Sequence, residues 1–180
     1  MATYRTINKE YELEDYNPSW NNKFLQIKKA IQNVFGDKLL SVQHVGSTSI
    51  KGMKAKPIID VLVIVHNMHD IKNERIEMEK LGYSYKENYI AEESMFFCRE
   101  KNGKRLENIH VFPVGHSKID EFIDKRDYLK THPQEIKRYE RIKSMLIKQF
   151  PNDYISYRKG KDKYLNTELR EKVVEWKRSQ

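Results

Sequence analysis

A short turn rich in glycine and serine joins two apolar segments in the first third of the chain. The first segment covers residues 39–45, the turn residues 46–49, and the second, β-branched segment residues 58–65. Such runs are typical of buried strands, so the sequence predicts a strand, a tight turn and a second strand. Asp60 is the only polar side chain in the second segment. A carboxylate in a buried strand is costly unless something pairs with it, so Asp60 marks a candidate site.

The aspartate is expected to face the turn. Side chains alternate along a strand, which places Asp60 on the same side as Leu62. Gly46 has no Cβ, so a backbone or a phosphate group can approach it closely, and the hydroxyls of Ser47 and Thr48 add hydrogen-bond donors. The turn and the aspartate together indicate a phosphate-binding site, and a plain tight turn between strands is the alternative.

Composition favours one soluble domain with an anionic partner. We expect a single domain over residues 1–180, with a helical C-terminal part over about 117–180. No apolar run approaches the roughly 20 residues that span a bilayer, and the N-terminus lacks the apolar core of a signal peptide, so we expect a cytoplasmic protein without a membrane partner. The net charge of +8 favours nucleotides, RNA or acidic proteins as partners. A lysine-rich surface that serves solubility explains the charge equally well.

The rest of the chain predicts an α+β fold. Apolar residues at helical spacing predict helices, which lie at about residues 18–36, 70–81, 118–130 and 133–150, with a last one that runs to about 176. Ser117 and Asp120 resemble a capping box at the start of the third helix. Further strands are expected at 83–88, 94–100 and 104–113, the last two joined by a type I′ turn at Asn102-Gly103. We therefore expect a mixed sheet of about five strands with flanking helices, followed by C-terminal helices.

A turn of this kind followed by an aspartate on the next strand resembles the DNA polymerase β-like nucleotidyltransferase fold. In that fold the turn holds a triphosphate and strand carboxylates hold magnesium. The closer resemblance is to the GrpB family of small bacterial proteins, whose signature is similar to residues 44–49, Gly52 and residues 55–60. Residues 109–111, 126–129, 132–133 and 157 resemble the same family in the C-terminal half. The resemblance covers nearly the whole chain and implies a nucleotidyltransferase-like fold.

The resemblance also implies a metal site, from which this chain departs. Asp60 would hold Mg²⁺ together with substrate phosphates and water. The fold usually has a second acid two positions further along, where this chain has Leu62, and a third on a neighbouring strand, where it has His110. His110 would share the metal with Asp60 or act as a general base near neutral pH.

Three cations complete the candidate ligand set. Arg126 lies on an otherwise apolar helix face and needs a phosphate or a carboxylate partner, with Asp60 as the alternative to a ligand. Lys56 could contact a phosphate, or pair with Asp60 or Glu93. Lys161 lies within residues 157–164, where basic residues alternate with tyrosines. That pattern binds a nucleotide or a single strand through charge and stacking, or forms a loop of solvated lysines before a helix.

Three functions remain open at this point. The first is a metal-dependent nucleotidyltransferase, with Ser47 on the phosphate, Asp60 on magnesium, and Arg126 and Lys161 around the charge. The second is a non-catalytic binder of a nucleotide, a phosphorylated metabolite or RNA. The third is an interaction protein with a degenerate site, in which Asp60 is buried against Arg126.

Overall fold

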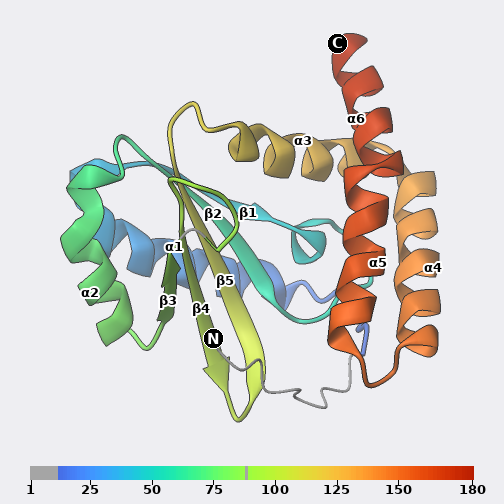
Figure 1. Ribbon diagram of the computed structural model, residues 1–180, viewed down its shortest axis with the longest axis horizontal. Coiled ribbons are helices and arrows are strands. Elements are labelled where there is room, and N and C mark those ends of the chain that lie inside the picture. The colour runs from blue at the N-terminus through green and yellow to red at the C-terminus, as the bar shows by residue number, and fades with distance from the viewer. Residues whose placement is uncertain (1–11, 88) are drawn as a thin grey trace.

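The computed structural model describes residues 12–87 and 89–180, and a mixed sheet forms the centre of this part of the chain (Figure 1). The strands are β1 (Leu39–Val45), β2 (Ile59–Val65), β3 (Ser84–Glu87), β4 (Met95–Lys101) and β5 (Lys104–Pro113). Their order in the sheet is β1-β2-β5-β4-β3, in which β2 and β5 run parallel and all other neighbours antiparallel. The predicted mixed sheet in an α+β fold is confirmed. Residue 88, the last of the expected strand 83–88, lies outside the described residues.

Helices surround the sheet on both faces and at one end. They are α1 (Ser19–Phe35), α2 (Lys72–Lys80), α3 (Ser117–Thr131), α4 (Pro133–Gln149), α5 (Tyr154–Asn166) and α6 (Glu168–Arg178). In Figure 1, α4, α5 and α6 stand beside the sheet at the end where β2 begins. Within the described ranges, no helix combines the length and the apolar character that crossing a membrane requires.

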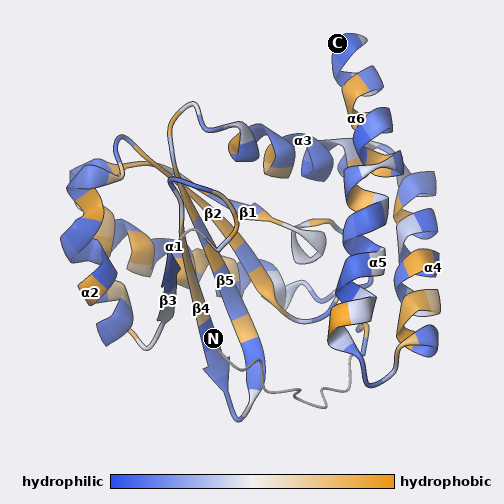
Figure 2. Cartoon of the chain, viewed as in Figure 1, coloured by the Kyte–Doolittle hydropathy of each residue, from blue (hydrophilic) through white to orange (hydrophobic). Residues whose placement is uncertain are grey.

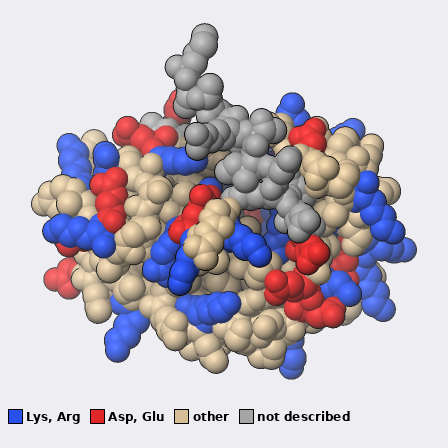
Figure 3. Space-filling model, turned by 90° about the horizontal axis from the view of Figure 1, so that it is seen from below, with Lys and Arg blue, Asp and Glu red and all other residues tan. Residues whose placement is uncertain are grey.

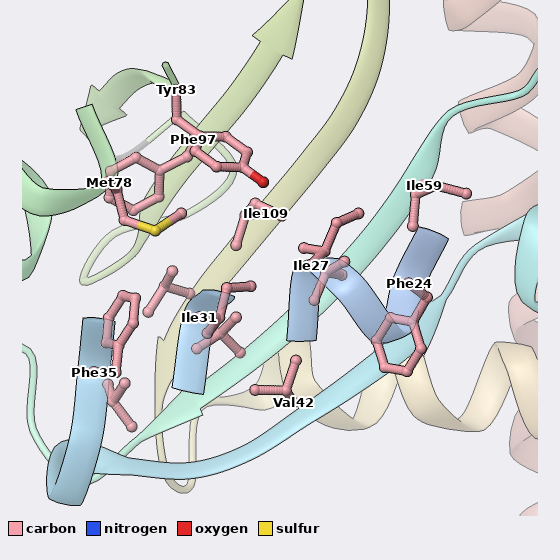
Figure 4. Close-up of a cluster of buried hydrophobic side chains, with 14 of the residues drawn as sticks. Phe24, Ile27, Ile31, Phe35, Val42, Ile59, Met78, Tyr83, Phe97 and Ile109 are labelled. Carbon is pink, nitrogen blue, oxygen red and sulfur yellow. The ribbon is translucent and has the colours of Figure 1, made fainter. Parts of the chain in front are cut away.

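One face of the sheet packs against α1 and α2. Phe24, Ile27, Ile31 and Phe35 recur at helical spacing on α1 and point at the strands (Figure 4). The odd-numbered residues of β2, from Ile59 to Val65, belong to the same cluster. This face is closed by apolar packing and therefore positions β2 without taking part in a polar site.

The other face of β2 carries Asp60, Leu62 and Ile64. Leu62 and Ile64 pack with Phe112 of β5 and Ile119 of α3, which confirms the predicted alternation. A further cluster joins α3 to α4, α5 and α6 around Tyr128, Tyr139, Tyr164 and Leu169. Figure 2 shows most of the hydrophobic colour on the central strands, whereas α4 to α6 are mainly hydrophilic with scattered hydrophobic turns.

The start of α3 differs from its predicted cap. Ser117 is the first helical residue, and His116 is the N-cap, whose Nδ1 accepts a hydrogen bond of 3.1 Å from the backbone N–H of Lys118. The predicted capping box is therefore wrong, because an imidazole supplies the acceptor expected from the serine.

The tyrosine-rich basic stretch is helical rather than a loop. Residues 157–164 lie entirely within α5, which Asp153 caps by accepting a hydrogen bond from the backbone N–H of Ser156. Gly160 in its middle faces α4, where a Cβ would lie 2.5 Å from Cδ2 of Leu146. The missing side chain lets the two helices approach closely, so interhelical packing outweighs the low helix propensity of glycine.

Candidate functional site

Asp60 and Gly46 form the centre of the candidate site. Asp60 lies near the start of β2 opposite Val45, the last residue of β1, and Gly46 follows with φ of +71°. A Cβ on Gly46 would lie only 2.6 Å from Oδ2 of Asp60. The group that approaches the glycine is therefore the aspartate carboxylate, and the predicted facing of Asp60 toward the turn is confirmed.

Two side chains of β5 contact the same carboxylate. Asn108 donates a hydrogen bond of 2.8 Å from Nδ2 to Oδ1 of Asp60, and Nε2 of His110 lies 3.5 Å from that oxygen. Burial alone raises the pKa of Asp60, but the hydrogen bond and charge of His110, with Asn108 and the charge of Lys161, outweigh it and hold the pKa below its usual value. The side chain is 27% exposed, so a charged carboxylate faces solvent at this point.

His110 is fixed by aromatic rings on both sides. The ring centroids of Phe96 and Phe122 lie 5.2 and 4.7 Å from that of the imidazole. Its Nδ1 is buried and has no hydrogen-bond partner among the residues that the structure describes. The prediction that His110 lies close to Asp60 is confirmed, since both residues lie on the same face of adjacent parallel strands.

Thr48 and His44 hold the turn from inside. Thr48 is buried, and its hydroxyl donates to the carbonyl oxygen of Ile58 at 3.2 Å. His44 Nε2 lies 3.0 Å from the same hydroxyl, so it is the donor of that pair. Burial, with the charges of Lys130 and Arg126, outweighs the opposing effect of Asp60 and lowers the pKa of His44 to about 4. Thr48 therefore takes part in the hydrogen bonding inside the turn. Its role toward a ligand stays a prediction.

A buried lysine reaches the turn from α4. Lys143 is only 3% exposed, and its Nζ donates to the carbonyl oxygen of Lys54 at 2.5 Å and lies 3.5 Å from Oγ of Ser47. Among the described residues, no carboxylate lies within 4 Å of this nitrogen. Burial, together with the charge of Lys161 and against that of Glu140, lowers the pKa of Lys143 to about 7.

Sequence reasoning missed Lys143, although a signal was present. The residue lies four positions after Tyr139 and three before Leu146, on the buried face of α4. A lysine on an apolar helical stripe needs a partner for the same reason that Arg126 does. Two hydrogen bonds of Asn108 were not anticipated: the one it donates to Asp60, and the one its Oδ1 accepts from Arg105 Nη1 at 3.0 Å.

Arg126 pairs with a neighbouring acid, and its contact with a phosphate stays a prediction. Its guanidinium forms a bidentate pair with Asp127 at 2.7 and 2.9 Å and donates to Gln43 Oε1 at 2.8 Å. It also donates to the carbonyl oxygen of His44 at 3.3 Å. The alternative in which Arg126 pairs with Asp60 is wrong, because a neighbouring carboxylate on its own helix satisfies it. Arg126 fixes the end of β1 just before the turn.

The other two predicted cations both lie at α5, Lys56 over two of its tyrosines and Lys161 on the helix itself. Nζ of Lys56 lies over the rings of Tyr154 and Tyr157, at 4.6 and 4.1 Å from their centroids. Nζ of Lys161 on α5 lies 3.5 Å from Oδ1 of Asp162. The charge of Lys161 also lowers the pKa of Asp60. The sequence left open an ion pair of Lys56 with Asp60 or Glu93. Lys56 forms neither of these two ion pairs, and nor does Lys161.

The site thus combines one carboxylate with several cations and donors. Asp60, Asn108 and His110 lie on the sheet, Gly46 and Ser47 on the turn, and the lysines on α4 and α5. A ligand with negative charge and several acceptor oxygens would fit such a set, because ammonium groups and hydroxyls all donate.

Comparison with known proteins gives a consistent result. A family model described as GrpB protein matches residues 10–171. UPF0157 protein YqkA of Bacillus subtilis is 35% identical over 94% of this chain and 49% of its own length, so the chain spans about half of that relative. Glutamate-rich protein GrpB of Alkalihalophilus pseudofirmus is 32% identical over 92% of this chain and 98% of its own. The crystal structure of conserved protein GrpB from Enterococcus faecalis superposes with a TM-score of 0.85 at 26% identity, covering 92% and 99% of the two chains.

Proposed function

The chain belongs to the GrpB family, and we propose that it binds a phosphate-bearing small molecule of the nucleotide class at the Gly46-Ser47 turn. The phosphate would lie beside Ser47 at the turn, within reach of the Lys143 ammonium, with Lys161 and Asp60 nearby. The backbone of a glycine turn and a serine hydroxyl are donors of the kind that hold phosphate oxygens.

The state of Lys143 carries this proposal. A buried ammonium without a carboxylate partner is expensive, and a second lysine adds to the cost. A phosphate next to Ser47 Oγ would supply the missing negative charge. The same cation would then stabilise the bound state and destabilise the empty one, which is the balance expected of a binding site.

Group transfer is the second candidate, and the contact between Asp60 and His110 supports it. A histidine beside a carboxylate can accept a proton from an attacking hydroxyl near neutral pH. Among the described residues, Nδ1 of His110 has no hydrogen-bond partner, so no second hydrogen bond fixes which ring nitrogen carries the proton. The reaction class would be phosphoryl or nucleotidyl transfer, in which positioning and charge stabilisation supply most of the catalysis.

The side chains around Asp60 do not fit the magnesium site that the resemblance to the nucleotidyltransferase fold implies. Oδ1 accepts from Asn108, Oδ2 lies against Gly46, and the nearest neighbours are donors rather than oxygen ligands. No group of three or more His, Cys, Asp or Glu side chains in the described ranges is placed to hold a metal ion. We therefore derive binding from the protein's own cations.

Thermal unfolding with ligands tests the proposal. We expect ATP, GTP or a sugar phosphate at about 100 times its Kd to raise the Tm by roughly 5–10 °C, with and without Mg²⁺. Lys143→Met should abolish this rise because it removes the buried cation. Lys148→Met, an exposed lysine on the same helix, should retain it. A Tm that no phosphate compound changes, or an equal rise in Lys143→Met, would contradict the proposal.

A further inference from the structure

A groove of about 760 Å³ runs along the outer side of α4, separate from the site at Asp60. It is lined by Lys54, from the segment between the turn and β2, and by residues of α4 that include Lys137, Glu140, Arg141, Met145 and Lys148. In Figure 3, lysine and arginine side chains form a nearly continuous column along the right-hand edge, on the side where α4 lies in Figure 1.

Three of the groove's cations lack acidic partners. Lys137, Arg141 and Lys148 have no carboxylate within 4 Å in the part of the chain that the structure describes. At 1.5 Å of rise per residue they are separated by roughly 6 and 10 Å along the helix axis. Lys54 pairs with Asp15 at 2.9 Å, and its backbone N–H donates to Glu140 at 2.5 Å. The groove therefore presents a row of uncompensated positive charge.

One apolar side chain, Met145, is among the residues that line the groove. Met145 is 58% exposed there, and the aliphatic stems of the neighbouring lysines and arginine lie beside it. An exposed methionine adapts to differently shaped apolar side chains and is common at protein-binding surfaces. A row of cations beside an exposed methionine is complementary to a helix with one acidic and one apolar side.

A nucleic acid fits this groove less well. Among the described residues, no aromatic ring lines it, so bases would find no stacking surface there of the kind that single-strand binders use. Charge and apolar surface together favour an acidic peptide.

We propose that this α4 groove docks an acidic amphipathic helix of a protein partner. Acidic side chains of the partner would pair with Lys137, Arg141 and Lys148 while an apolar side chain packs on Met145. This inference goes beyond ligand binding at the Gly46-Ser47 turn and does not depend on it.

Fluorescence anisotropy with a labelled synthetic helix of about 18 residues, carrying glutamates at i and i+4 and leucines on one side, tests the proposal. We expect saturable binding that weakens with salt. The double variant R141E/K148E should raise the Kd about tenfold or more, and Met145→Ser about threefold. The matched control K23E/K29E, at exposed lysines of α1, carries the same charge change and should alter the Kd less than about twofold.

Four results would overturn the proposal. They are no saturable binding of the helix, equal binding of a scrambled peptide of the same composition, tighter binding of a single-stranded RNA, and an equal loss in K23E/K29E. Circular dichroism of each variant distinguishes loss of peptide binding from loss of the fold. All four charge changes are at exposed positions, so we expect each variant to fold.

Discussion

Replacing Gly46 with alanine is expected to lower the free energy of unfolding by about 3–4 kcal/mol. Two costs add at this position. The residue has φ of +71°, which disfavours any side chain, and a Cβ would lie 2.6 Å from Oδ2 of Asp60. The turn or the carboxylate must move, so the candidate site is disturbed together with the fold. Urea unfolding monitored by circular dichroism measures the effect.

Gly52 offers a matched control. Its φ is +82°, but nothing lies within 4 Å of where its Cβ would be, so alanine there should cost only about 1–2 kcal/mol. The additional loss at Gly46 should shrink when Asp60 is also alanine, because the 2.6 Å contact with Oδ2 is then removed and only the 3.1 Å contact with Cβ of residue 60 remains. An equal cost at the two glycines would show that the close approach of the carboxylate is not a constraint.

Replacing Lys143 with methionine is expected to change how stability depends on pH. In the unfolded chain this lysine titrates near 10.5, and in the folded protein its pKa is about 7. Between these values the unfolded chain binds the proton and the folded protein does not, so raising the pH stabilises the fold. Wild type should gain roughly 2–3 kcal/mol over Lys143→Met between about pH 7 and about pH 9.5.

Denaturant unfolding of both proteins across this range gives the difference directly, and the other titrating groups cancel in it. Lys148→Met should follow the wild-type curve at every pH, because that side chain is exposed. A Lys143→Met curve parallel to the wild type would mean that the buried lysine keeps its ordinary pKa in the fold.

Local patterns sufficed for most of the fold and for the centre of the site. Strand alternation placed Asp60 and His110 on one face, and Asn102-Gly103 adopts positive φ at both residues, as the predicted type I′ turn requires. These features depend on the alternation of side chains along a strand and on the positive φ that glycine tolerates, and a sequence shows both directly.

The missing parts depend on contacts between distant segments. Lys143 reaches Ser47 across 96 positions of the chain, and its spacing shows only that it lies on a buried face. Arg126 was placed correctly on an apolar face, but its partner was not identifiable, because Asp127 competes with every distant acid. The alternative in which 157–164 forms a loop is wrong, because the packing of α5 on α4 at Gly160 is a tertiary contact.

The central claim is that Lys143 is a buried lysine whose positive charge is compensated by an anionic ligand. NMR titration of the lysine ε-carbons, with and without saturating ATP or inorganic phosphate, tests it most directly. We predict that the free protein shows one lysine with a pKa of about 7, assigned by its absence in Lys143→Met. An anion favours the charged form of a neighbouring ammonium, so the ligand should raise this pKa toward 10.5. A titration of Lys143 that neither compound alters would contradict the account.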